Sequence, residues 1–227
     1  MAIAYVTSNT AQSTDANDVT VTIDSTGANL LVVSLSIWQG RSAYSFSDNK
    51  SNTWTALTEY GSINPQTKQW YCLNPSSVGT SHSISITGAG GGAPALAIHA
   101  FSGAGAFGSE GGNNANSTSV DTASLTPASD GAVLVAVVSY PNTSAGHSGG
   151  GTYTGFSNLN VTGNAMGIAT SYYIQPTAGA IYETFTGNSQ EQQTSHCCFT
   201  VASTASPIVL FDDVLSGGFH SFKSGAM

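Results

Sequence analysis

Asn29–Trp38, with the sequence NLLVVSLSIW, is the stretch that decides the fold. It contains no charged residue, no proline and no glycine. An apolar run of this length, bounded by turn residues, is typical of a strand that lies in the middle of a sheet. Gly131–Tyr140 (GAVLVAVVSY) has the same character a hundred or so residues later. The two stretches predict a pair of central strands in an all-β protein.

The composition supports the same fold class. Charged residues make up 7% of the 227 residues, against roughly 25% in ordinary soluble domains. Long helices in water need Glu and Lys on their exposed face, whereas the Thr, Val, Ile, Tyr and Phe that are plentiful here favour strands. The chain is long enough to bury a core without a metal or a disulfide.

The two halves of the chain resemble each other. Thr53–Leu57 (TWTAL) matches Thr152–Phe156 (TYTGF) at nearly the offset that relates the two central stretches, and Ala95–Ser102 falls opposite Ser195–Ala202. The Gly-rich segment Gly103–Asn116 lies between the halves and is predicted to be a flexible connection.

This repeat leads to a specific fold prediction. We expect residues 1–206 to form an antiparallel, jelly-roll-like β-sandwich with an internal pseudo-repeat, at about residues 14–103 and 117–203. The alternative is two tandem immunoglobulin-like sandwiches. Residues 207–227 are predicted to be a C-terminal arm or a pair of edge strands. The candidate interface residues in this arm are Phe211, Asp212, Asp213, Phe219 and Phe222.

The charge excludes some partners. The net charge is −8 and there are four basic residues, so nucleic acid and anionic membranes are not expected, because both need clustered Lys and Arg. The chain opens without a basic and apolar leader, which predicts no secretory signal. Three cysteines are present, and either all are small buried side chains or Cys72 pairs with Cys197 or Cys198.

No catalytic or metal motif is evident. The histidines are scattered, and no His, Asp or Glu pair has the spacing of a metal site on a strand. Glu183 is unusual because it shares a strand face with Ile181 and Phe185, but it has no evident partner acid of the kind that glycoside hydrolysis requires. We therefore predict a protein without enzymatic activity, cofactor or metal.

Aromatic residues are the stronger candidates for a binding surface. Several lie at predicted strand ends or in adjacent pairs, where one ring of the pair must face away from the other. Exposed rings can stack on sugars, whereas rings of this kind can also cover a core or a sheet edge. The candidate ligand or interface aromatics are Trp38, Trp54, Trp70, Tyr71, Tyr172 and Tyr173.

Four segments carry a resemblance to a loosely defined family. They are the NLLVV strand Asn29–Val33, the hairpin Asp48–Thr55 with Ser51 where Gly is usual, the strand end Trp70–Pro75, and the late strand Ala97–Gly103. With these features the chain is similar, over about Thr14–Ser203, to β-sandwich modules of bacteriophage structural proteins and bacterial surface proteins. The resemblance implies a sandwich fold, and it carries no catalytic residue.

These expectations lead to one functional prediction. The low charge and the abundance of Ser, Thr and Asn are typical of an extracellular protein, yet no export signal is expected. A virion protein reconciles the two, because it is made in the host cytoplasm and released by lysis. We expect a bacteriophage capsid decoration protein on the particle surface, homo-oligomeric and bound to the major capsid protein or other virion proteins. The alternative is a receptor- or carbohydrate-binding module of a phage tail or cell surface that binds a host-surface glycan.

Overall fold

The computed structural model describes residues 1–13, 17–38, 43–61, 64–141, 147–149, 152–159 and 166–203. Within these ranges every regular element is a β-strand, and every strand pairing is antiparallel. The predicted all-β, antiparallel sandwich is thereby confirmed. No helix in this part of the chain is long and apolar enough to span a membrane.

The first large sheet has Asn29–Trp38 at its centre. Its strand order is β1 (Ala4–Gln12), β8 (Ala95–Ser102), β3 (Leu30–Ile37), β6 (Gln66–Leu73) and β5 (Thr55–Ala56). All eight side chains of β3 are buried. A strand with neighbours on both edges and layers on both faces needs such a continuous apolar run, which is why this stretch lies in the middle.

The second large sheet repeats the arrangement. Its order is β11 (Ser148–Gly149), β14 (Thr184–Val201), β10 (Val133–Tyr140), β13 (Gly167–Ile174) and β12 (Thr154–Leu159), and β9 (Ala104–Asp121) also pairs with β14. The run β14–β10–β13–β12 has the same order as β8–β3–β6–β5. All eight side chains of β10 are buried as well.

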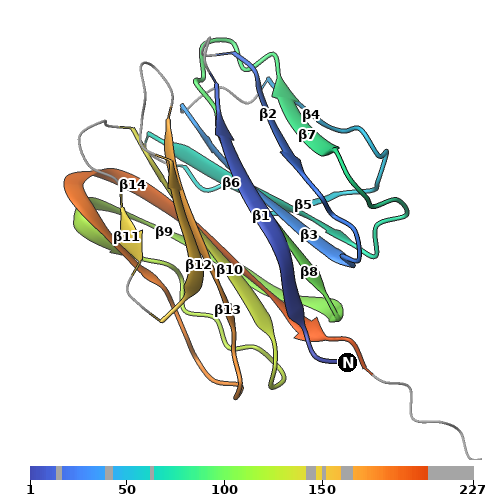
Figure 1. Cartoon of the computed structure of the whole chain (residues 1–227). Coiled ribbons are helices and arrows are strands. Elements are labelled where there is room, and N and C mark those ends of the chain that lie inside the picture. The colour runs from blue at the N-terminus through green and yellow to red at the C-terminus, as the bar shows by residue number, and fades with distance from the viewer. Residues whose placement is uncertain are drawn as a thin grey trace, which may run out of the picture.

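A three-stranded sheet covers the outer face of the first large sheet. Its order is β2 (Val19–Ile23), β7 (His82–Thr87) and β4 (Ser45–Asp48). In the second half, the ends of two long strands form the outer layer. β9 pairs with β14 there at Val120 and Phe185, and β11 pairs with the same part of β14. β9 and β14 therefore run through both layers, and they curve together at the left of Figure 1.

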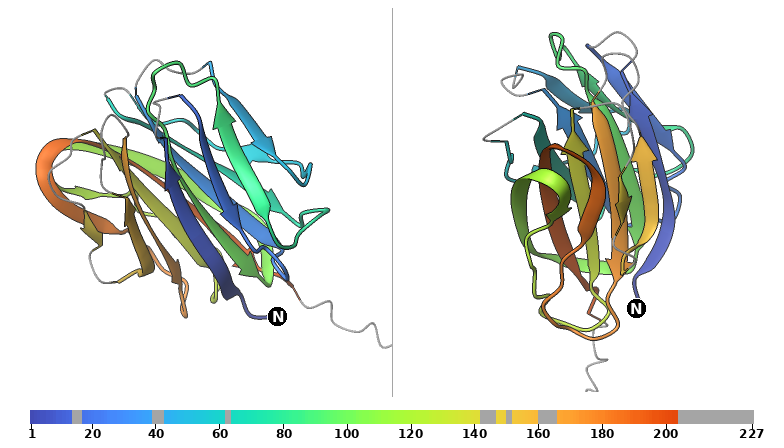
Figure 2. Two further views of the ribbon diagram at one scale, coloured as in Figure 1. Left: turned by 45° about the horizontal axis from the view of Figure 1, so that its top comes forward. Right: turned by 90° about the vertical axis from the view of Figure 1, so that its left-hand side faces the viewer.

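The layers stack into one body (Figures 1 and 2). Leu30, Val32 and Phe101 pack between the two large sheets against Val133, Val135 and Phe199 of the second half. Each large sheet also has its own outer core. Leu31 and Val33 pack on the β2–β7–β4 sheet, and Leu134 and Ala136 pack among Val120 and Phe185. In the described part of the chain, no strand of one half hydrogen-bonds into a sheet of the other.

Two details of the sequence prediction are corrected. β3 and β10 have equal lengths, so Leu30 corresponds to Val133 and not to Ala132. Aligning Asn29 with Gly131 is therefore wrong by one residue, and a slip of one exchanges the two faces of a strand. With the corrected alignment, Leu30 and Val133 both face the other half.

The predicted flexible connection is also wrong, because Gly103–Asn116 leads directly into β9 and forms most of it. Its glycines serve close packing. A Cβ at Gly112 would overlap the ring of Tyr60, and one at Gly108 would press on the sulfur of Cys198. Glycine in a strand often marks such a close approach, which composition alone does not distinguish from flexibility.

Candidate functional site

The six candidate aromatics do not form a common surface. Trp54 and Trp70 pack in the outer core of the first half, where Trp70 stacks on Phe46 with ring centroids 4.8 Å apart. Tyr71 stacks on Phe107 between the halves. Tyr172 and Tyr173 face opposite sides of the second large sheet. Trp38, 38% exposed, is the one large exposed ring among the six.

Other candidates are placed as follows. The three thiols are free and lie in three separate cores, Cys72 in the first outer core, Cys197 between the halves and Cys198 in the second outer core. Cys72 therefore pairs with neither of the others. No group of three His, Cys, Asp or Glu that could hold a metal occurs in the described residues. The candidate arm residues, Phe211, Asp212, Asp213, Phe219 and Phe222, lie outside them.

A Ser–His–Asp chain occurs in the first half that the sequence did not reveal. Ser25 Oγ lies 2.8 Å from Nδ1 of His82, and Nε2 of His82 lies 2.9 Å from Oδ1 of Asp48. These residue types in this order are those of serine hydrolases. However, Ser25 and His82 have no exposed surface, and Ser25 Oγ already accepts the Gly79 N–H. A serine nucleophile must be able to reach its substrate, so these three hydrogen-bonded side chains have a structural role.

Asp48 is the centre of this network. Its carboxylate accepts hydrogen bonds from the Lys50 N–H, the Asn52 side-chain amide and the Trp54 indole N–H, in addition to its contact with His82. Its side chain is only 3% exposed. The hairpin sequence DNKSNTW is explained by these bonds, because the polar residues of the loop converge on one acid.

Burial raises the pKa of Asp48, but the hydrogen bonds from Lys50, Trp54 and Asn52, together with the charge of His82, outweigh burial. The net effect holds the pKa below its ordinary value of 3.8. The carboxylate is therefore ionised at neutral pH, and the folded state is stabilised by that ionised form.

Ser51 sits in the same hairpin with a backbone φ of +56°. This is the left-handed region, which costs a residue with a Cβ about 1–2 kcal/mol and glycine much less. We expect Ser51→Gly to stabilise the protein by about 0.5–1 kcal/mol, after allowance for the freer unfolded chain. Urea unfolding measures the change. Ser47→Gly in strand β4 is the matched control and should destabilise, and a loss of stability in Ser51→Gly would contradict the prediction.

The second half holds a buried polar cluster in its outer core. The Tyr153 hydroxyl lies 2.7 Å from Nε2 of His196, and Nδ1 of His196 lies 2.9 Å from the Ala123 carbonyl oxygen. That carbonyl only accepts, so Nδ1 carries the proton and Nε2 accepts the tyrosine O–H. Burial lowers the pKa of His196 to about 4, so the imidazole is neutral at pH 7.

Glu183 lies beside this pair and is 1% exposed. Its backbone N–H donates to Thr122 Oγ1. Burial raises the pKa of Tyr153 strongly, and the nearby charge of Glu183 adds to the effect. Tyr153 therefore stays protonated and remains the donor to His196.

The positions in the first half that are equivalent to this polar cluster hold apolar side chains. Strand pairing makes Trp54 equivalent to Tyr153, because each precedes a Thr that faces the equivalent residues Tyr71 and Tyr172. By the same pairing His196 takes the place of Ile98, and Ser171 the place of Trp70. The first half shows that this position in the fold is satisfied by an apolar core, so the polar set is specific to the second half.

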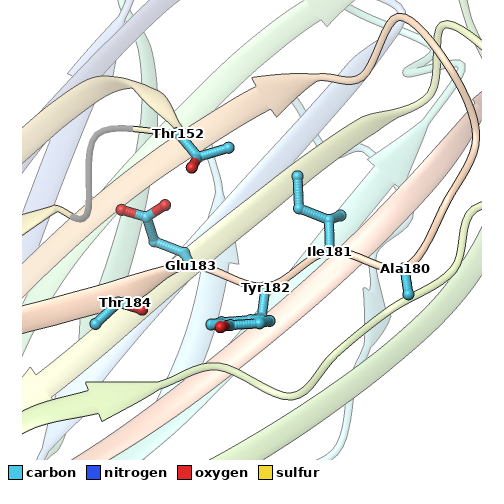
Figure 3. A pocket seen from close by; sticks show the side chains of 6 residues that line it. All are labelled: Thr152, Ala180, Ile181, Tyr182, Glu183 and Thr184. Atoms are coloured by element: carbon cyan, nitrogen blue, oxygen red, sulfur yellow. The ribbon is translucent and has the colours of Figure 1, made fainter.

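A pocket of about 290 Å³ opens beside this cluster. Its lining residues are Thr152, Ala180, Ile181, Tyr182, Glu183 and Thr184. The carboxylate of Glu183 and the Thr152 side chain point toward one another on one side of the 180–184 segment, and the ring of Tyr182 lies on the other side (Figure 3). Tyr182 is 51% exposed. This cluster and pocket are the candidate functional site.

Of these residues the sequence pattern indicated Glu183, because its charge interrupts an apolar strand face. Comparisons with family models, with curated proteins and with solved structures found no match.

Proposed function

We propose that the protein is a non-enzymatic structural component of a bacteriophage virion that decorates the outside of the capsid. The body supports such a role, since its stacked antiparallel sheets enclose buried cores and the chain carries little charge. Its partner would be the major capsid protein, and it would act as a homo-oligomer on the particle surface. This assignment builds on the segments that resemble phage and bacterial surface modules.

One observation carries the proposal. The first and the last described residues lie at the same end of the body (Figure 1). A hollow of about 450 Å³ opens there, lined by Met1, Gly27, Asn29, Ser102, Gly103, Ala202 and Ser203. The candidate arm continues from Ser203 at this end. A body attached by one end leaves the opposite end, where β3 reaches Trp38, free to face solvent.

The test is binding of the purified chain to expanded heads assembled from the capsid protein that is encoded next to its gene. We expect saturable binding that falls at least tenfold in the full-length variant Phe211→Ser/Phe219→Ser/Phe222→Ser. Trp38→Ala, at the other end of β3, is the control and should bind normally. An unmodified chain that stays an inert monomer and ignores the heads would overturn the proposal.

The second candidate function is a carbohydrate-binding module. It is favoured by the pocket beside Glu183, which combines hydrogen-bonding side chains with an exposed ring. The six aromatics predicted from the sequence give it less support, because most of them are packed within the body.

A further inference from the structure

The pocket lies along an edge of strand backbone at Tyr182, where no strand pairing occurs among the described residues. Ile181 exchanges backbone hydrogen bonds with Leu125, and Glu183 is bonded through its backbone to Thr122. Because backbone groups alternate in direction along an extended chain, those of Tyr182 point away from these partners. β11 covers the same edge further along, at Phe185 and Thr186. We call this pocket, which lies between Ala180 and the part of the edge that β11 covers, the notch.

The notch offers a defined set of contacts. Its polar groups are the Glu183 carboxylate, the Thr152 and Thr184 hydroxyls, and the backbone N–H and C=O of Tyr182. Its apolar surface comes from Ile181 and the exposed Tyr182 ring. Hydrogen-bonding side chains on one side of the 180–184 segment and an aromatic ring on the other match a ligand that lies against the strand edge and carries several hydroxyls on a compact ring with an apolar face.

The residues that line the notch argue against anionic ligands. None of the described residues that line the notch is a Lys or an Arg, and one carries a carboxyl group, so these residues offer a phosphate or a sugar acid no cation to pair with. The volume of about 290 Å³ is at the small end of the range of roughly 300–1,000 Å³ for ligand pockets.

The internal repeat indicates that the polar cluster behind the notch is not required by the fold. Burying hydroxyl, imidazole and carboxyl groups costs stability unless each is well bonded. The first half has Trp54, Trp70 and Ile98 at the positions equivalent to Tyr153, Ser171 and His196. The polar side chains at this place in the second half are therefore a feature that the fold itself does not require.

We propose that the notch beside Glu183 binds one residue of a neutral saccharide. The sugar hydroxyls bond to Glu183, Thr152 and the Tyr182 backbone, and the Tyr182 ring covers an apolar face of the sugar. Tyr153 and His196, bonded to one another behind the notch, are positioning residues that hold the outer core around Glu183. The inference rests on the second candidate function and does not depend on capsid binding.

The test is titration of the full-length chain with the methyl glycosides of glucose, galactose and mannose and with N-acetylglucosamine, followed by NMR. Glucuronic acid is the anionic control. We expect at least one neutral sugar to bind, and Tyr182→Ala and Glu183→Gln each to weaken that binding at least tenfold. Trp38→Ala is the matched exposed aromatic and should change it less than twofold. Tyr182 is half exposed, so its variant should fold even where Glu183→Gln does not.

The outcomes are distinguishable. Binding of a neutral sugar that Tyr182→Ala leaves unchanged, or that Trp38→Ala abolishes, overturns the notch as the site and leaves carbohydrate binding standing. If no neutral sugar binds, both the notch as a sugar site and carbohydrate binding as a function are overturned. Tighter binding of glucuronic acid than of the glucoside overturns the assigned ligand class.

Discussion

Replacing Asp48 with alanine should cost about 3–5 kcal/mol of folding free energy, as removal of one partner of a buried, hydrogen-bonded charge does. The Lys50 N–H, the Asn52 amide and the Trp54 indole would lose their acceptor, and His82 would lose its partner at Nε2. Buried donors left without a partner carry their full desolvation cost. Urea unfolding followed by tryptophan fluorescence measures the loss.

Two further variants identify the cause. Asp48→Asn keeps the shape and one acceptor, so it should lose less than Asp48→Ala. Asp24→Ala removes an exposed acid that bonds only to the nearby Thr26, and it should have a much smaller effect. If Asp48→Ala and Asp24→Ala had equal effects, Asp48 would not be the centre of the hairpin network.

The same network predicts a dependence on pH. The pKa of Asp48 is lowered in the folded state, so the protein gains stability from this group above pH 4 or so. That contribution is lost as the pH falls through the lowered pKa. We expect the unmodified protein to lose stability between pH 5 and pH 2, in part through Asp48. In Asp48→Asn that part of the loss should be missing.

The strands were predictable from the sequence because their apolar residues follow the period of two or fill every position. The paired aromatics illustrate what this pattern omits. Trp70 and Tyr71 are adjacent and therefore face opposite ways, but both sides of this sheet are covered, by the small sheet and by the other half. A sequence does not state how many layers cover a strand, so a ring that faces away from one core resembles a surface residue in the sequence pattern.

The candidate site was less predictable than the fold. Glu183 was recognisable because a charged residue interrupts an apolar face. His196 was not, since its hydrogen bond to Tyr153 joins residues 43 positions apart in the sequence. The sequence match that sets Ser195–Ala202 opposite Ala95–Ser102 is also wrong by two residues, because strand pairing makes His196 equivalent to Ile98. Once Leu30 is aligned with Val133, His196 falls opposite Ile98, and the change from apolar to polar becomes visible. The comparison of the halves thus depends on strand pairing.

Replacing Gly103 with alanine should destabilise the protein by about 2–5 kcal/mol. Gly103 joins β8 to β9 and therefore the first half to the second. Its φ of +76° lies in the left-handed region, which costs about 1–2 kcal/mol for alanine. A Cβ at this position would also overlap the Ala2 carbonyl oxygen. Overpacking against atoms that cannot move aside adds about 1–3 kcal/mol.

Gly27 provides the matched control. Its φ of +81° is nearly the same, but a Cβ there meets no atom within 4 Å. Gly27→Ala should therefore show the conformational cost alone, and the difference between the two variants in urea unfolding measures the overlap with Ala2. Because Gly103 also accepts the Ala202 N–H, movement of this turn would disturb the end of β14 as well. Equal losses in the two variants would mean that the junction between the halves adjusts freely, contrary to the close approach of the Ala2 carbonyl oxygen to Gly103.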